Sequence, residues 1–179
     1  MKLSLFLRIL RKMPTDARIS AIETLTEMSE VEKNEADCMG VKISNILVLV
    51  LIDLSKDDEK YVRKEVASND TTPAEVLTEL SRDDDSLVRS NVASNLRTPA
   101  EVLTKLSRDD DSWVRSNVVY NPKTPAEVLT ELSKDEDCHV RYFVAGNPRT
   151  PKKVLTILSK DEVLIVQEAA KANPNFQKE

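Results

Sequence analysis

The stretch TPAEVLTELSRDDDS, from Thr72 to Ser86, decides the fold because the chain repeats it. It returns nearly unchanged from Thr98 and Thr124, and in a more altered form from Thr150, so the offset is 26 residues each time. A unit this short cannot bury a hydrophobic core alone, and neighbouring units must stack and share one. The sequence therefore predicts an α-solenoid, a repeat array whose usual role is to present a long surface.

Each unit is predicted to hold two short helices, which makes the chain all-α. The first begins at Thr-Pro-Ala-Glu, where Thr72 would be the N-cap and Glu75 would complete a capping box. Val76, Leu77 and Leu80 then form one apolar stripe. An acidic turn follows, and its negative charge favours the start of the second helix. This second helix has valines on its inner side.

The offset also predicts the domain organisation. Residues 1–19 are expected to form an amphipathic capping helix and residues 176–179 a tail. Between them the repeats fall at 20–45 (degenerate), 46–71, 72–97, 98–123, 124–149 and 150–175. The first helix of 46–71 is apolar all round, and such a helix is expected to be covered on every side. Leu3, Phe6 and Leu10 share one helical face, so we expect residues 3–12 to cover it.

Composition narrows the classes of function. The 179 residues contain 26 basic and 31 acidic side chains, a net charge of −5, and an acidic body is a poor surface for nucleic acid. Cys38 and Cys138 lie in different units and are interpreted as free thiols. The longest apolar run, Ile46 to Ile52, is seven residues, against the ~20 that span a bilayer. These features predict a cytoplasmic protein without a membrane segment.

The repeat resembles a known family. Its order of proline-glutamate-valine-leucine, acidic turn, valine-arginine and asparagine-proline is similar to the leucine-rich repeat variant family and, more distantly, to HEAT repeats. The resemblance covers 46–175 well and 20–45 in part. It implies a right-handed superhelix of alternating α- and short 3₁₀-type helices. Some members carry a cysteine-rich iron–sulfur segment before the repeats, but Cys38 stands alone here, so no cluster is carried over.

A column of arginines recurs at fixed spacing from aspartates. The column is Arg63, Arg89, Arg115 and Arg141, each six residues after Asp57, Asp83, Asp109 and Asp135. It is either a basic strip for phosphates or a ladder that joins units, and we favour the ladder because every arginine has a carboxylate at the same spacing. The last unit keeps Asp161 but has Gln167 in the arginine slot, which would fit arginines that reach the next unit's aspartate.

Aromatic side chains concentrate on two adjacent second helices. Trp113, Tyr120, Tyr142 and Phe143 fall in units 98–123 and 124–149, and His139 occupies the slot that Trp113 holds one unit earlier. Clustered surface aromatics are enriched at protein interfaces, so this set is a candidate protein-binding patch. The alternative is that the rings fill gaps between units.

Signals for catalysis or metal binding are weak. Cys138 and His139 adjoin Asp135 and Asp137, but without a second histidine or a cysteine pair. We therefore expect no catalytic, cofactor or metal residues. The expected function is a non-catalytic scaffold that binds an unidentified protein through the second helices. The alternative is a nucleic-acid-binding solenoid, whose basic face would consist of Lys60, Arg63, Lys64, Arg89 and Arg115. An exposed end of the array near Phe176 is a candidate homodimer contact.

Overall fold

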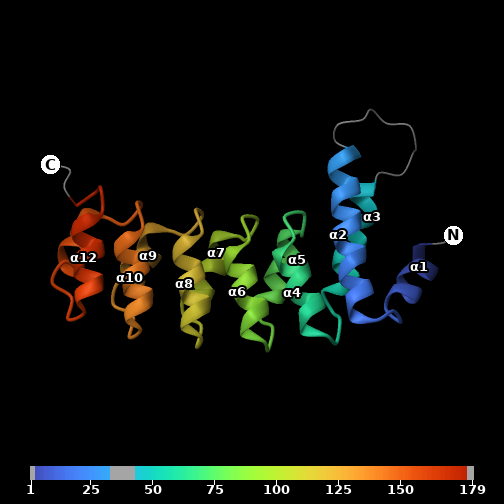
Figure 1. Cartoon of the computed structure of the whole chain (residues 1–179), viewed down its shortest axis with the longest axis horizontal. Coiled ribbons are helices and arrows are strands. Elements are labelled where there is room, and N and C mark those ends of the chain that lie inside the picture. Colours follow the sequence, from blue (N-terminus) through green and yellow to red (C-terminus); the bar gives the residue numbers. More distant parts are fainter. Residues whose placement is uncertain (1–2, 33–42, 177–179) are drawn as a thin grey trace. The chain divides into compact units, whose positions relative to one another are not determined.

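The computed structural model describes residues 3–32 and 43–176, and these residues form twelve α-helices and no strand (Figure 1). The chain divides into two compact units, Met1–Arg97 with helices α1 to α6 and Thr98–Glu179 with helices α7 to α12. The predicted all-α solenoid of repeats is confirmed. None of the described helices is both long enough and apolar enough to cross a membrane.

Two short helices alternate along the repeats. The first helices have seven residues each and are α5 (Ala74–Leu80), α7 (Ala100–Leu106), α9 (Ala126–Leu132) and α11 (Lys152–Leu158). The second helices have nine residues each and are α4 (Lys60–Ser68), α6 (Ser86–Ser94), α8 (Ser112–Tyr120), α10 (Cys138–Gly146) and α12 (Leu164–Ala172). All of these are α-helices, so the alternation with 3₁₀ helices that the resemblance implies is not found in the described residues.

The core runs between the two helices of each repeat. The apolar stripe of α7 is buried at Val102, Leu103 and Leu106, and α8 buries Val114 and Val118 against it. Second helices also pack on one another, α4 on α6 in one unit and α8 on α10 and α10 on α12 in the other. Each buried aliphatic side chain contributes about 1.5–3 kcal/mol, and most of that contribution depends on a neighbouring helix.

The predicted capping box at the first helices is wrong. The residue before α5 is Pro73, whose extended backbone precedes the helix without a side-chain cap. Thr72 is fully buried instead, and its hydroxyl donates to the carbonyl of Val66 at 2.6 Å. That carbonyl belongs to the last turn of α4 and also accepts the backbone amide of Asn69 at 3.3 Å. The buried hydroxyl is thus satisfied by the helix before it, which leaves the threonine unable to cap the helix that follows.

Aspartates cap the second helices, in agreement with the acidic turn. Asp85, Asp111 and Asp137 each accept a hydrogen bond from the backbone amide two residues later, at 2.7–2.9 Å. A carboxylate at this position satisfies an orphan amide and complements the helix dipole.

The amino-terminal part departs from the expected boundaries. Here the helices are α1 (Leu3–Leu10), α2 (Thr15–Glu32) and α3 (Ile43–Leu54), so the expected boundary between residues 19 and 20 falls inside α2. Helix α2 packs on both α3 and α4, as Figure 1 shows. It therefore lies beside α4 as α4 lies beside α6. Residues 33–42 of the degenerate repeat, including Cys38, and the tail beyond residue 176 lie outside the described residues.

Helix α3 is covered on one side, and the expectation that it is covered all round is wrong. Leu47, Val50, Leu51 and Leu54 are buried, whereas Leu49 and Ile52 are exposed. Leu10 of α1 is buried, and Arg11, which follows α1, donates from Nε to Asp53 of α3 at 2.7 Å. Phe6 is half-buried and the side chain of Leu3 lies outside the described part. That α1 caps the array stays a prediction.

Candidate functional site

The arginine column, called here the arginine ladder, joins successive repeats. In the first unit, Arg63 of α4 makes a two-pronged contact with Asp83, Nε to Oδ2 at 2.6 Å and Nη2 to Oδ1 at 2.9 Å. Its Nη1 donates to the backbone carbonyl of Asp57, six residues earlier, at 2.8 Å. The aspartate of the same repeat thus supplies a carbonyl, and the aspartate of the next repeat supplies the carboxylate.

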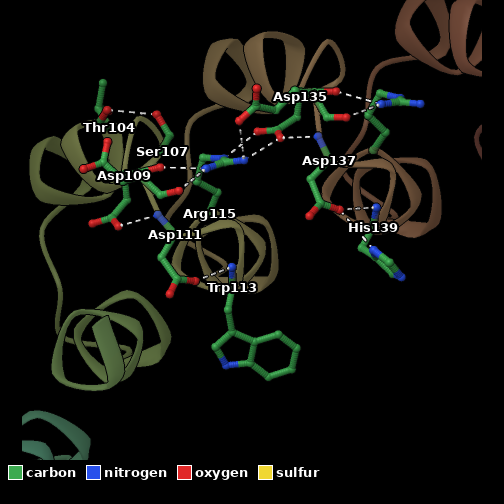
Figure 2. Close-up of polar contacts among 12 residues, drawn as sticks. Thr104, Ser107, Asp109, Asp111, Trp113, Arg115, Asp135, Asp137 and His139 are labelled. Atoms are coloured by element: carbon green, nitrogen blue, oxygen red, sulfur yellow. Dashed lines mark hydrogen bonds and ion pairs between the residues drawn. The ribbon is translucent and has the colours of Figure 1, made fainter. Parts of the chain in front are cut away.

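The same geometry recurs in the second unit, where Figure 2 shows Arg115 between two acidic turns. Arg115 donates to Asp135 at 2.7 and 2.8 Å and to the carbonyl of Asp109 at 2.7 Å. Arg141 contacts Asp161 at 2.8 and 3.0 Å. Both arginines are largely buried, as are their carboxylates. Gln167, in the arginine slot of the last repeat, keeps only the carbonyl bond, to Asp161 at 2.7 Å.

Two of these contacts, Arg63 with Asp83 and Arg141 with Asp161, shift the pKa values of both partners. The hydrogen bond from Arg141 holds the pKa of Asp161 below its ordinary value, and the bond to Asp161 raises the pKa of Arg141. Burial acts to raise the pKa of Asp83, but hydrogen bonds from Arg63 and from the backbone amide of Asp85 outweigh it, and the pKa is lowered. Each pair is therefore held in its charged form at neutral pH.

Sequence reasoning missed one member of the ladder. Asp57 accepts from Nη1 of Arg18 at 2.6 Å, and Arg18 lies in α2, outside the 26-residue register. Arg18 Nη2 also donates to Thr15 at 3.2 Å. Helix α2 thus supplies the guanidinium that a preceding repeat would otherwise supply. Arg18 is the one arginine of α2, but its spacing from Asp57 gives no signal in the sequence.

Asparagines at the ends of the second helices form a second ladder. Asn95 donates to the carbonyls of Ala67 and Asn69 at 2.8 and 3.0 Å, one repeat earlier. Asn173 does the same toward Ala145 and Asn147 at 2.7 and 2.9 Å. The side-chain oxygen of each accepts the amide two residues later. The sequence signal that could have found this ladder is the recurrence of asparagine at the same position of successive repeats, because other residue types can also end a helix.

The other asparagines of the second helices make local bonds. Asn91 donates to the carbonyl of Leu87 at 2.7 Å and Asn117 to that of Trp113 at 3.0 Å. These side-chain amides therefore bond to the backbone of their own helix.

Asp137, Cys138 and His139 lie together at the start of α10, with one ligand atom of each within 4.8 Å of the others. His139 Nδ1 is 3.1 Å from Asp137 Oδ1 and 3.9 Å from Cys138 Sγ. That same Oδ1 accepts the amide of His139, and this bond is the main cause of the lowered pKa of Asp137. Three consecutive residues of one turn, with the carboxylate already used as a helix cap, form an open arrangement that does not enclose an ion.

The five residues of the candidate protein-binding patch separate into two groups. Tyr120, Tyr142 and Phe143 cluster near the carboxyl-terminal ends of α8 and α10, with ring centroids 5.1 Å apart for Tyr120 and Phe143 and 5.4 Å for Tyr142 and Phe143. Trp113 and His139 lie at the opposite ends of these helices. Tyr120 lies seven positions after Trp113, about 10 Å along the helix axis.

Most of these rings face solvent. Trp113 is 63% exposed, Tyr120 62% and Tyr142 39%, while Phe143 is half-buried beneath the two tyrosines. Figure 2 shows the Trp113 ring pointing away from the arginine ladder. The rings other than Phe143 therefore do not serve as filling between repeats.

A hollow of about 360 Å³ lies beside the tyrosines in the second unit. It is lined by Tyr120, Pro122, Tyr142, Phe143, Gly146, Asn147, Pro148 and Arg149. Sequence reasoning named the three aromatics of this lining but not the prolines, Gly146 or Arg149. The signal for Gly146 is the alignment of the repeats, which puts it in the slot of Tyr120.

The basic face of the nucleic-acid alternative is largely consumed by internal contacts. Arg63 and Arg115 hold carboxylates as described, and Lys60 pairs with Asp85 at 2.8 Å. Lys64 lies near Glu65 at 3.6 Å. Phosphate binding needs cations that are not already neutralised, so these pairings disfavour the nucleic-acid alternative.

Comparisons with known proteins agree with the repeat pattern. No family model and no curated protein matches the sequence. Among solved structures, the chain is similar to "a leucine-rich repeat variant with a novel repetitive protein structural motif", at 25% identity over 96% of this chain and 71% of that one, with a TM-score of 0.61.

Two engineered proteins of known structure show a weaker likeness, at 21% and 22% identity over 96% and 92% of this chain. The matches cover 94% and 56% of those proteins, and the TM-scores of 0.49 and 0.45 are too low to bear on the family.

Three observations lead to one conclusion: the 26-residue register, the helix pair of each repeat and the likeness to the solved variant. The chain is a leucine-rich-repeat-variant-like repeat protein.

Proposed function

We propose that this protein is a non-catalytic scaffold that binds another protein through the surface lined by its second helices. The candidate contact residues are Trp113, Tyr120, His139, Tyr142 and Phe143. The observation that carries the proposal is the exposure of Trp113 and Tyr120, both above 60%, on α8, whose one charged side chain, Arg115, is tied into the arginine ladder. Large rings held at the surface by a rigid array are the kind of group that dominates binding energy at interfaces.

Site-specific photo-crosslinking in the native host tests the surface. A benzophenone amino acid is placed at Tyr120, on second helix α8, and in a parallel strain at Ala126, an exposed residue of first helix α9. The proposal expects a discrete protein adduct from Tyr120 and none from Ala126. Equal labelling at both positions, or none at Tyr120, contradicts it.

The captured partner is then purified and its affinity measured. Trp113→Ala and Tyr120→Ala should each weaken binding by at least about 1 kcal/mol, roughly fivefold, with little change in melting temperature. Tyr61→Ala, an exposed residue in the same slot as Trp113 but in the first unit, is the matched control. Unchanged affinity in both α8 variants would exclude this surface.

The other predictions about partners can be tested with the same purified protein. The pairing of Arg63 and Arg115 with carboxylates argues against the nucleic-acid alternative. A homodimer through an end of the array remains a proposal, and it would cover the exposed Ile157, Leu164 and Ile165 of α11 and α12. Light scattering of the purified protein and of Leu164→Glu distinguishes a dimer from a monomer. We also propose a cytoplasmic location, where Cys138 would stay reduced.

A further inference from the structure

The hollow beside Tyr142 exists because the residue that would fill it is glycine. Gly146 ends α10 in the slot that Tyr120 occupies one repeat earlier. Its backbone does not adopt positive φ, and a Cβ built there meets nothing within 4 Å. Neither backbone conformation nor packing therefore requires glycine, a residue that weakens helices relative to alanine. The missing side chain leaves Phe143 accessible between the two tyrosines.

The walls of the hollow are rings. The Phe143 ring is tilted by 54° from Tyr120 and by 63° from Tyr142, so the three do not stack flat on one another. Pro122 and Pro148 also line the hollow. Grooves walled by aromatic rings take proline-rich segments well, since an extended polyproline helix is already ordered before it binds.

The charge at the rim is positive, in a chain whose net charge is −5. Arg149 lines the hollow, and its guanidinium donates to the carbonyls of Thr124 at 2.6 Å and Asn121 at 3.3 Å. Carbonyls orient the guanidinium but do not neutralise it. A few residues further along, the exposed Lys152 and Lys153 replace the Ala-Glu that begins the other three first helices of this kind.

We propose that this hollow, called here the Gly146 pocket, docks an extended segment of a partner protein that carries proline next to aspartate or glutamate. The proline ring would enter against Phe143, and the carboxylates would lie toward Arg149 and the paired lysines. This inference rests on the proposed function, because it names the partner chemistry of one part of the same surface. A partner strand of nucleic acid, whose bases could stack on the same rings, is the competing outcome of the test.

Fluorescence anisotropy with defined probes tests the chemistry. The probes are a short labelled peptide of alternating proline pairs and acidic residues, the same peptide with alanine for proline, the same peptide with lysine for the acids, and an oligothymidine. The proposal expects the acidic proline peptide to bind at least tenfold more tightly than either altered peptide. Equal binding of the three peptides, or tighter binding of the oligothymidine, overturns it.

The site is tested with variants of the full chain. Gly146→Tyr restores the residue of the preceding repeat and fills the hollow, so it should weaken peptide binding at least tenfold. Arg149→Gln should weaken it less, and Gly146→Ala should keep most of the binding. Melting temperatures report whether each variant is folded, and amide shifts in nitrogen-15 spectra should centre on Gly146 and Asn147. Shifts that centre elsewhere, or full binding by a folded Gly146→Tyr variant, would refute the assignment.

The captured partner separates this inference from the proposed function. If Gly146→Tyr binds that partner normally while Trp113→Ala does not, the Gly146 pocket is wrong and the scaffold proposal stands. If neither variant affects the partner, both fail. Loss of partner binding in Gly146→Tyr, with loss of the peptide probe, supports both.

Discussion

Arg115 shows how one side chain can join three segments of the chain. Its guanidinium donates to the carboxylate of the next repeat and, from the other prong, to two carbonyls of its own acidic turn, Asp109 and Asp110. Removal of one partner from a buried ion pair leaves an uncompensated charge, which typically costs about 3–5 kcal/mol. The ladder is therefore a structural requirement of each repeat rather than a set of free cations.

We predict that Arg115→Gln destabilises the protein by about 3 kcal/mol, measured by urea unfolding. Glutamine can keep the carbonyl bond, as Gln167 does, but leaves Asp135 without its guanidinium. Arg108→Gln is the matched control, because Arg108 pairs with Glu131 in an exposed position where loss costs under about 1 kcal/mol. Similar losses in the two variants would show that burial does not strengthen the ladder.

The sequence predicted some contacts of the ladder residues and not others. The spacing of six from aspartate to arginine, with Gln167 as the exception, indicated pairing across repeats. It could not show that the arginine binds the backbone carbonyl of its own repeat's aspartate. Every residue has such a carbonyl, so the sequence does not mark the one that accepts the bond. For the same reason Thr72 was assigned to the helix that follows, although its hydroxyl bonds to the helix before it.

At the scale of elements, helices α1 to α3 show where the repeat register ends. The second helices have similar lengths because each begins at an acidic turn and ends near an asparagine. Helix α2 follows Pro14 and not a repeat-type acidic turn, and it continues for 18 residues. Its apolar residues matched the register in part, which was enough to suggest a repeat at 20–45 but not to place its helices.

Helix α1 depends on one deeply buried side chain. Leu10 is 1% exposed, whereas the adjacent Ile9 is 47% exposed. We predict that Leu10→Ala lowers the free energy of unfolding by about 2–4 kcal/mol, and that Ile9→Ala changes it by less than about 1 kcal/mol. Thermal unfolding followed by circular dichroism measures both. A small effect of Leu10→Ala would mean that α1 is dispensable for the first unit.

At the scale of the whole molecule, stability is the sum of similar contacts made at successive repeats. The sequence predicted this repetition well, because a 26-residue period leaves few other ways to bury the stripes. It predicted the candidate binding surface less well. The exposure of Tyr120 and the hollow at Gly146 depend on how neighbouring side chains fill space, and residue types alone do not determine that.

Repetition also predicts how the protein responds to acid. The pKa values of Asp83 and Asp161 are lowered by their arginines, and those of the helix caps Asp85 and Asp137 are lowered by Lys60 and by the amide of His139. The unfolded chain, with ordinary carboxyl pKa values of 3.8, binds protons before the folded chain does. The free energy of unfolding therefore rises as the pH increases through the range in which these carboxyl groups lose their protons, and it reaches its full value above that range.

We accordingly predict a nearly constant free energy of unfolding from about pH 7 to 5, and a fall as the pH drops through 3.8 and below. Urea unfolding at a series of pH values measures this profile. Arg141→Gln should flatten the acid limb, because it removes the hydrogen bond that is the largest cause of the lowered pKa of Asp161, whereas Arg108→Gln should leave the limb unchanged. An acid limb that persists unchanged in Arg141→Gln would mean that groups other than the ladder carboxylates control the acid sensitivity.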